Sequence, residues 1–332
     1  MSEREYAATQ KSSVADRISG AVWGQFAGDA FCLGSHWIYD LGELEQRFPG
    51  GPRGFEEPAA GHYHAGKRPG DLTHYGDGAL LLLRSLQERG RFDALDFGSR
   101  FVSLIGSPGY TGYRDHAARE TVANYRAWRE VHPDEAYSYQ DGADDDQPAS
   151  ITRLAPLVAR YFRDSDLAGI VERATRVCQN NERAVAYNLT HAMILQKLFN
   201  GSALDDAVGH TAEQAPQLGA EGVMIAGQIA AAVAGRNLSI REATLKFGQS
   251  CPLAGSFPAA LQCALHYADD IGEALRATAA VGGDNAARGA MIGSWLGASL
   301  GVQTLSDGWY ESLSAREEIA SGVKWLVRLA EG

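Results

Sequence analysis

The fold is encoded most clearly in Gly20-Ala21-Val22-Trp23-Gly24-Gln25-Phe26-Ala27-Gly28-Asp29-Ala30, where glycine recurs at every fourth residue. This spacing places the glycines on one face of a helix, and the missing side chains let another helix approach closely. Each glycine inside a helix costs up to about 1 kcal/mol relative to alanine, so the run requires a compensating packing gain. The same spacing recurs at Gly289, Gly293, Gly297 and Gly301. We therefore predict two tightly packed central helices, one near each end of the chain.

Helical patterns fill most of the remaining chain, whereas alternating, strand-like runs are scarce. We predict an all-α protein, a single compact multi-helix bundle over residues 1–332 with residues 1–11 as a flexible tail. Long polar segments at 36–72, 107–116 and 131–150 interrupt the helices, and loops of that length are usually functional or disordered. Apolar residues at helical spacing predict helices at 79–86, 119–129, 151–162, 167–177, 183–198, 220–234, 259–268, 271–280, 287–300 and 315–329.

Composition and charge exclude several classes of protein. The net charge of −11 and the pI near 5.3 argue against nucleic-acid binding, which needs clustered lysine and arginine. The four cysteines are scattered and indicate reduced thiols rather than a disulfide framework. Residues 1–16 lack the apolar core of a signal peptide, and no run of about 20 uninterrupted apolar residues indicates a membrane span. We expect a cytoplasmic protein with no membrane partner, and the oligomeric state stays open.

Two aspartates follow glycine-bearing turns and precede long apolar stretches. Asp77 lies in His74-Tyr75-Gly76-Asp77-Gly78, and Asp284 lies in Gly282-Gly283-Asp284-Asn285. The start of a helix leaves N–H groups unpaired, so a carboxylate at this position can cap the helix or face a cavity. If the two helix starts converge, the carboxylates form the floor of an active site, and otherwise they are ordinary caps.

Four landmarks in order resemble the ADP-ribosylglycohydrolase family over nearly the whole chain. They are the glycine-rich helix at 20–30, the segment Tyr75-Gly76-Asp77-Gly78, the segment Ser150-Ile151-Thr152-Arg153-Leu154-Ala155-Pro156, and Gly282-Gly283-Asp284-Asn285-Ala286-Ala287. The resemblance implies an all-α fold and cleavage of the bond between ADP-ribose and an acceptor. It also implies a pair of Mg²⁺ ions held by oxygens of the two acidic motifs.

The departures from the family pattern change the expected site. Only Asp77 and Asp284 keep their acidic positions, and His36 stands where the family has an early glutamate. Cys178-Gln179 stands where the family has Thr-His. These exchanges resemble a divergent branch that includes jellyfish J1-crystallins. Two carboxylates can hold at most one weakly bound Mg²⁺ ion, so magnesium is doubtful, and we expect no organic cofactor.

The candidate catalytic residues are therefore Asp77, Asp284 and His36. Carboxylates stabilise the oxocarbenium-like state of glycosidic cleavage, and a histidine can donate a proton near neutral pH. The alternative for Gln179, Asn180 and Asn181 is capping of the helix that starts near Glu182, and the alternative for His36 is a hydrogen-bonded loop residue. Arg288 forms either a salt bridge with Asp284 or a bidentate contact with a phosphate. The candidate substrate-binding residues are Tyr39, Gln179, Asn180, Asn181, Asn285 and Arg288.

Two functions fit these residues. The first is hydrolysis of a ribosyl or ADP-ribosyl glycosidic bond in a small-molecule or ADP-ribosylated substrate. The alternative is a catalytically retired member that serves as a ligand-binding or structural, crystallin-like protein. At the site positions of the family, polar residues are replaced by other polar residues rather than lost, which favours a changed activity.

Overall fold

A computed structural model describes residues 12–332, so the tail expected at 1–11 lies outside the described residues. Within the described range the chain is helical and contains no strand, which confirms the predicted all-α fold. The elements are α2 (Val14–Cys32), η1 (Leu33–Ser35), α3 (Leu41–Arg47), α4 (His74–Arg89), α5 (Ala94–Ile105), α6 (His116–Val131), η2 (Ile151–Arg153), α7 (Leu154–Tyr161), α8 (Leu167–Arg176), α9 (Glu182–Phe199), α10 (Leu204–Gln214), η3 (Ala215–Leu218), α11 (Gly219–Ala234), α12 (Ile240–Phe247), α13 (Leu253–His266), α14 (Ile271–Ala279), α15 (Asn285–Leu300), η4 (Val302–Thr304), α16 (Asp307–Ser312) and α17 (Arg316–Glu331).

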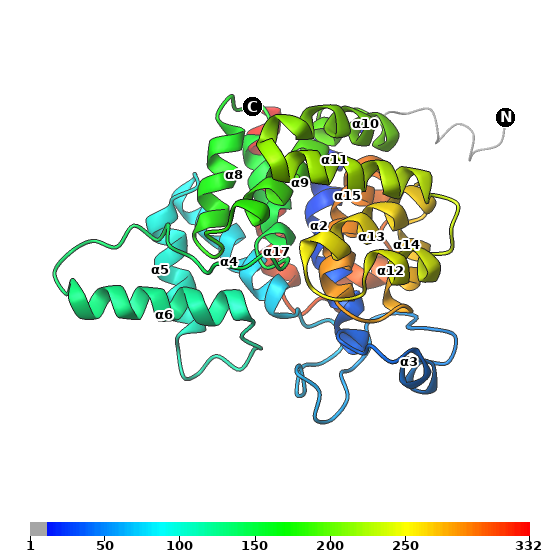
Figure 1. The fold of residues 1–332 in the computed structure, drawn as a ribbon, viewed down its shortest axis with the longest axis horizontal. Helices are drawn as coiled ribbons and strands as arrows, with labels where there is room; N and C mark the ends of the chain where they lie inside the picture. The colour runs from blue at the N-terminus through cyan, green and yellow to red at the C-terminus, as the bar shows by residue number, and fades with distance from the viewer. Residues whose placement is uncertain (1–11) are drawn as a thin grey trace.

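The two glycine-rich helices pack against each other in the middle of the molecule (Figure 1). A Cβ atom added to Gly24 would overlap the carbonyl oxygen of Gly293, and one added to Gly293 would overlap that of Gly24. Gly20 faces Gly297 and Gly28 faces Gly289 in the same reciprocal way, so the pairs follow one antiparallel interface. The predicted close approach is therefore confirmed, with backbone against backbone.

This antiparallel pairing positions the site. The C-terminal end of α2 lies beside the N-terminal end of α15, so the residues after α2 meet the turn before α15. The start of α4 joins them through Asp29, whose carboxylate accepts from the Thr73 amide at 2.8 Å and from the Thr73 hydroxyl at 2.5 Å. Burial raises the pKa of Asp29 to about 6. Three segments distant in sequence thus converge at one end of the central helix pair.

The sequence patterns did not predict several of the helices. Among them α5 begins after Asp93, whose side chain accepts from the amides of Leu95 and Asp96. The predicted loop at 36–72 contains only the short α3, and the loop at 131–150 contains no helix. The first of these loops begins and ends at the converging helix ends, since His36 and the Thr73 cap flank it.

By length and composition alone, one helical stretch in the described part of the chain, Leu204–Ala234, is long and apolar enough to cross a membrane. Only 22% of its apolar window is buried in the fold. The stretch is broken by η3, which carries Pro216. A single stretch of this kind is weak evidence, so the absence of a membrane partner stays a prediction.

Candidate functional site

Neither predicted aspartate caps its helix. Thr73 caps α4, because its side chain accepts from the Tyr75 amide at 3.2 Å. Asp284 occupies the N-cap position of α15, yet its side chain makes no capping hydrogen bond. The turn before it needs two consecutive glycines, since Gly282 and Gly283 have φ angles of 64° and 62°. Capping therefore does not explain either carboxylate.

Asp284 lies in a buried polar environment. Its side chain is inaccessible to solvent, and the hydroxyl of Tyr75 donates to Oδ2 at 3.1 Å. His36 Nδ1 lies 3.7 Å from Oδ1, which has no hydrogen-bond partner among the described residues. Burial raises the pKa of Asp284 to about 6, and the positive charge of Arg288 opposes this shift. A buried carboxyl with a free oxygen is costly unless a ligand or water completes it.

Arg288 braces the turn that holds Asp284. Its guanidinium donates to the hydroxyl of Thr278 at 3.1 Å, to the carbonyl of Gln249 at 3.3 Å, and to the carbonyl of Gly282. No carboxylate lies within 4 Å of it in the part of the chain that the structure describes, so the salt bridge with Asp284 does not form. Since the side chain is fully buried, its charge acts on Asp284 through space.

Asp77 has different neighbours. Lys67 Nζ lies 3.1 Å from its Oδ2, and the hydroxyl of Tyr110 donates to the same oxygen at 2.9 Å. These three residues line a pocket of about 290 Å³ that Asp284 does not line. Residues two apart on a helix point about 200° away from each other, so Tyr75 and Asp77 leave α4 in different directions. The structure therefore brings Tyr75, rather than Asp77, to Asp284.

Three histidines gather beside Asp284, and sequence patterns identified only one of them. His36, His64 and His74 are 0%, 2% and 6% exposed, and one ring nitrogen of each lies within 4.8 Å of the others. Burial lowers the pKa of His36 well below its ordinary value, and the neighbouring histidines lower it further. This environment favours the neutral ring of His36 at neutral pH over the protonated ring that a proton donor would use.

Aromatic side chains cover the histidines on one side. Trp37 packs on His36 with ring centroids 4.2 Å apart and meets Tyr113 edge-on at 4.7 Å. Its backbone has a φ of 59°, a conformation that costs a bulky residue on the order of 1–3 kcal/mol. The Trp37 amide donates to the Gly283 carbonyl at 2.7 Å, which holds this conformation in place. Strain of this kind is typical of functional sites.

Tyr39 and Cys251 also lie near Asp284. The Tyr39 hydroxyl is 4.0 Å from Cys251 Sγ, and 45% of Tyr39 is exposed. Burial and the charge of Asp284 raise the pKa of the Cys251 thiol. Tyr39, a predicted substrate-binding residue, is therefore the most accessible group next to Asp284.

The other predicted substrate-binding residues have structural contacts. Gln179 is fully buried; its Nε2 donates to Asp145 Oδ1 at 3.0 Å, and its Oε1 accepts from the Ser150 amide at 2.9 Å. Asn181 caps α9, since its Oδ1 accepts from the Ala184 amide at 3.0 Å. The capping alternative is thus confirmed for Asn181.

The remaining two asparagines differ in exposure. Asn180 is exposed and accepts from Arg176 Nη1 at 2.7 Å. Asn285 is buried next to His36, and its Nδ2 donates to Ser35 Oγ at 2.8 Å. Of the predicted substrate-binding residues, only Tyr39, Asn285 and Arg288 lie close to Asp284.

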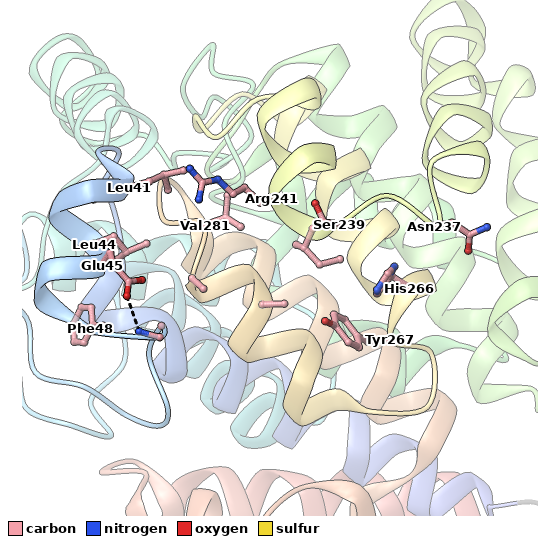
Figure 2. Close-up of a pocket in the computed structure, with 15 residues that line it drawn as sticks. Leu41, Leu44, Glu45, Phe48, Asn237, Ser239, Arg241, His266, Tyr267 and Val281 are labelled. Carbon is pink, nitrogen blue, oxygen red and sulfur yellow. Dashed lines mark hydrogen bonds between the residues drawn. The ribbon is translucent and has the colours of Figure 1, made fainter.

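A pocket of about 740 Å³ lies elsewhere, between α3, the start of α12 and the ends of α13 and α14 (Figure 2). None of the predicted site residues lines it. Its carboxylate, Glu45, already accepts from the Gly50 amide at 3.0 Å. Size alone does not make this pocket the candidate site, because its polar groups do not converge.

The donors around the two aspartates do not fit a pair of magnesium ions. Mg²⁺ prefers six oxygen ligands in near-octahedral geometry. Asp77 shares its oxygens with an ammonium and a hydroxyl, and Asp284 faces an imidazole and a phenol. No third carboxylate joins either aspartate among the described contacts. The surroundings of the two aspartates therefore do not suit two adjacent magnesium ions.

Comparison with known proteins supports this assignment of the fold. A model of the family described as ADP-ribosylglycohydrolase matches residues 10–332. Crystallin J1A of Tripedalia cystophora is 26% identical over 326 residues, covering 95% of this chain and 97% of the relative. Crystallin J1B of the same organism is 24% identical, covering 95% and 98%. A solved structure titled ADP-ribosylglycohydrolase-related protein complex has the same fold, with a TM-score of 0.69 and 23% identity over 96% of this chain and 99% of that chain.

Proposed function

Because this chain belongs to the ADP-ribosylglycohydrolase family, we propose that it is a hydrolase that cleaves the glycosidic bond of a ribosyl or ADP-ribosyl group. The observation that carries the proposal is the free Oδ1 of Asp284, a buried carboxyl oxygen without a hydrogen-bond partner. It lies at the second glycine-flanked helix start, beside an imidazole and a phenol.

In the proposed reaction, water attacks the anomeric carbon while the bond to the acceptor breaks. The carboxylate of Asp284 stabilises the positive charge that develops on the ribose ring. Tyr75 holds Oδ2 through its hydroxyl, so Oδ1 is the oxygen that faces the reacting group. The attacking water loses a proton, and the leaving acceptor gains one.

Asp77 is proposed as the second carboxylate, acting from the neighbouring pocket. Lys67 provides a positive charge there, which suits a phosphate of the same substrate. A substrate that spans both places would have its ribose at Asp284 and a phosphate at Lys67. This arrangement favours an ADP-ribosyl group over a bare ribosyl group.

The test is release of ADP-ribose from peptides that carry the group through nitrogen or through oxygen. Wild-type protein should release it, and Asp284→Asn should be slower by roughly 100-fold or more. Burial disfavours the charge of Asp284, so this variant should melt no earlier than wild type. Asp269→Asn, at an exposed turn, is the matched control and should keep full activity.

The crystallin relatives favour a second candidate function, a family member without catalysis. Isothermal titration with free ADP-ribose separates the two candidates. Binding without release from any peptide would support the non-catalytic function. Full activity of Asp284→Asn would instead remove Asp284 from the proposed mechanism.

A further inference from the structure

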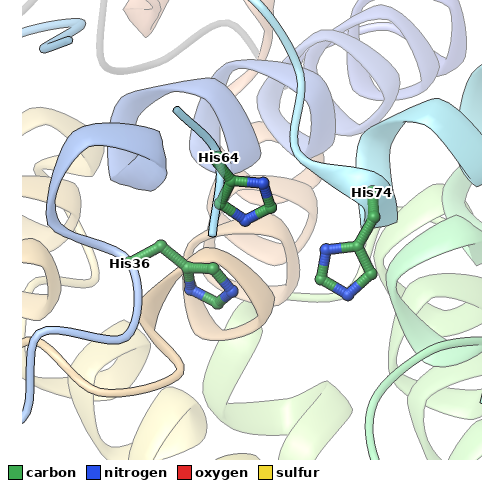
Figure 3. A group of neighbouring side chains, drawn as sticks. All are labelled: His36, His64 and His74. Carbon is green, nitrogen blue, oxygen red and sulfur yellow. The ribbon is translucent and has the colours of Figure 1, made fainter. Parts of the chain in front are cut away.

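The three buried histidines converge from separate parts of the chain. His36 follows η1, His64 lies in the long loop between α3 and α4, and His74 is the first residue of α4. Figure 3 shows the three rings facing one another. Their centroids are 5.4 Å, 5.6 Å and 6.2 Å apart. No part of the proposed hydrolysis uses His64 or His74.

Most nitrogens of this cluster have no hydrogen-bond partner. Within residues 12–332, both nitrogens of His64 and both of His74 lack one, as does Nε2 of His36. Buried polar atoms without partners cost free energy, and native proteins contain few of them. One nitrogen of each ring lies within 4.8 Å of the other two, so three of these five atoms share one place and call for a common explanation.

We propose that His36, His64 and His74 bind one divalent transition-metal ion, with zinc as the best-suited ion. Three imidazoles with an open fourth position are typical of zinc sites, in which the metal–nitrogen distance is about 2.0–2.1 Å. In a tetrahedral site the ligand nitrogens are then about 3.4 Å apart, so the rings need only tilt inward from their present separation. Nitrogen donors select zinc and its neighbours over magnesium, which prefers oxygen.

Carboxylates stand behind two of the three rings. Asp115 Oδ2 lies 3.4 Å from His74 Nε2, which leaves Nδ1 of His74 to face the metal. Asp284 Oδ1 lies 3.7 Å from His36 Nδ1, which leaves Nε2 of His36. Metal-binding histidines commonly donate their other ring N–H to a carboxylate, which fixes the tautomer. The two buried carboxylates also balance the charge of a divalent ion.

The tautomer of His36 has to change when a metal binds. In this structure the amide of Ala286 donates to His36 Nδ1 at 3.3 Å, which places the ring proton on Nε2. A metal on Nε2 displaces that proton and selects the tautomer with a proton on Nδ1, 3.7 Å from Asp284 Oδ1, and the hydrogen bond from Ala286 is then lost.

The test is zinc titration of the full chain after removal of metal with a chelator, read by competition with a chromophoric indicator. Wild type should bind one equivalent tightly, and Co²⁺ should give the absorption bands of a tetrahedral nitrogen site. His64→Gln should weaken binding by more than the roughly 10–100-fold that loss of an outer carboxylate costs, and Asp115→Asn should weaken it within that range.

His191→Gln is the matched control, because His191 is equally buried, has no partner for either nitrogen, and lies outside the cluster. It should bind zinc as wild type does. His64 makes no side-chain hydrogen bond, so His64→Gln should fold, and its circular dichroism spectrum checks this. If His64→Gln binds zinc as tightly as wild type does, the proposal is wrong. The binding would then be adventitious and come from exposed histidines.

Discussion

The close packing of α2 on α15 can be tested by adding a single methyl group. Gly24→Ala places a Cβ atom against the carbonyl oxygen of Gly293. Carbon and oxygen in weak contact lie about 3.3–3.6 Å apart, so the helices would have to separate by on the order of 1 Å. The obstacle is backbone, and no side-chain rotation can relieve it.

Two effects of opposite sign decide the result. Alanine is the better helix former, which stabilises the variant by about 1 kcal/mol. Overpacking a well-packed interface costs about 1–3 kcal/mol, and a rigid backbone contact belongs at the upper end. We therefore expect Gly24→Ala to lower the free energy of unfolding by about 2 kcal/mol.

Gly227→Ala provides the matched control. Gly227 is exposed on α11, and an added Cβ atom would meet nothing within 4 Å. Only the helix-forming effect remains there, so this variant should gain about 0.5–1 kcal/mol. Urea unfolding followed by circular dichroism measures both changes. If Gly24→Ala unfolds at the same urea concentration as wild type or at a higher one, the packing argument is wrong.

Two further predictions concern α9. Burial lowers the pKa of His191 to about 3, so between that value and the ordinary value of about 6.5 only the unfolded chain takes up the proton and stability falls as pH falls. Between pH 7 and pH 5 the free energy of unfolding of His191→Leu should therefore fall by about 2 kcal/mol less than that of wild type. Urea unfolding at both pH values measures the two decreases, and equal decreases would contradict the prediction. Asn181→Ala removes the cap of α9 and should cost about 1 kcal/mol, whereas Asn180→Ala, at an exposed position, should change the unfolding free energy by less than about 0.5 kcal/mol. Thermal melting compares the two asparagine variants, and an equal loss in both would rule out the cap as the cause.

The fold could be predicted because its signals are local. Glycine spacing of four is visible in the sequence and corresponds directly to the α2–α15 interface. The pairing of Gly24 with Gly293 joins residues at opposite ends of the chain. The glycine spacing therefore predicted the two helix faces, but not which glycine of one helix meets which glycine of the other. The helix α5 was missed although Phe97, Phe101 and Ile105 recur at helical spacing and Asp93 is a recognisable cap.

The site was harder to predict because its members come from irregular loops. His36 and Asp284 were identified from their positions in motifs, and the structure places them 3.7 Å apart. His64 lies in a polar loop without periodicity, and His74 was quoted only as a neighbour of Asp77. Three histidines in one cluster produce no spacing signal when the chain between them folds back irregularly. A search for histidines near the ends of predicted long loops would have found His64.

The exchange of residues at this end of the fold has a consistent chemical direction. The resemblance to the family implies oxygen donors for magnesium, and in this chain His36 stands at one such position and Tyr75 at another. The structure adds His64 and His74, so nitrogen donors now surround the place where Asp284 keeps its carboxylate. Random loss of ligands would leave apolar or solvent-exposed side chains there, whereas these rings are buried and close together, and two of them face carboxylates. Selection for a different ion explains both the missing oxygens and the gathered nitrogens, and loss of function alone explains only the first.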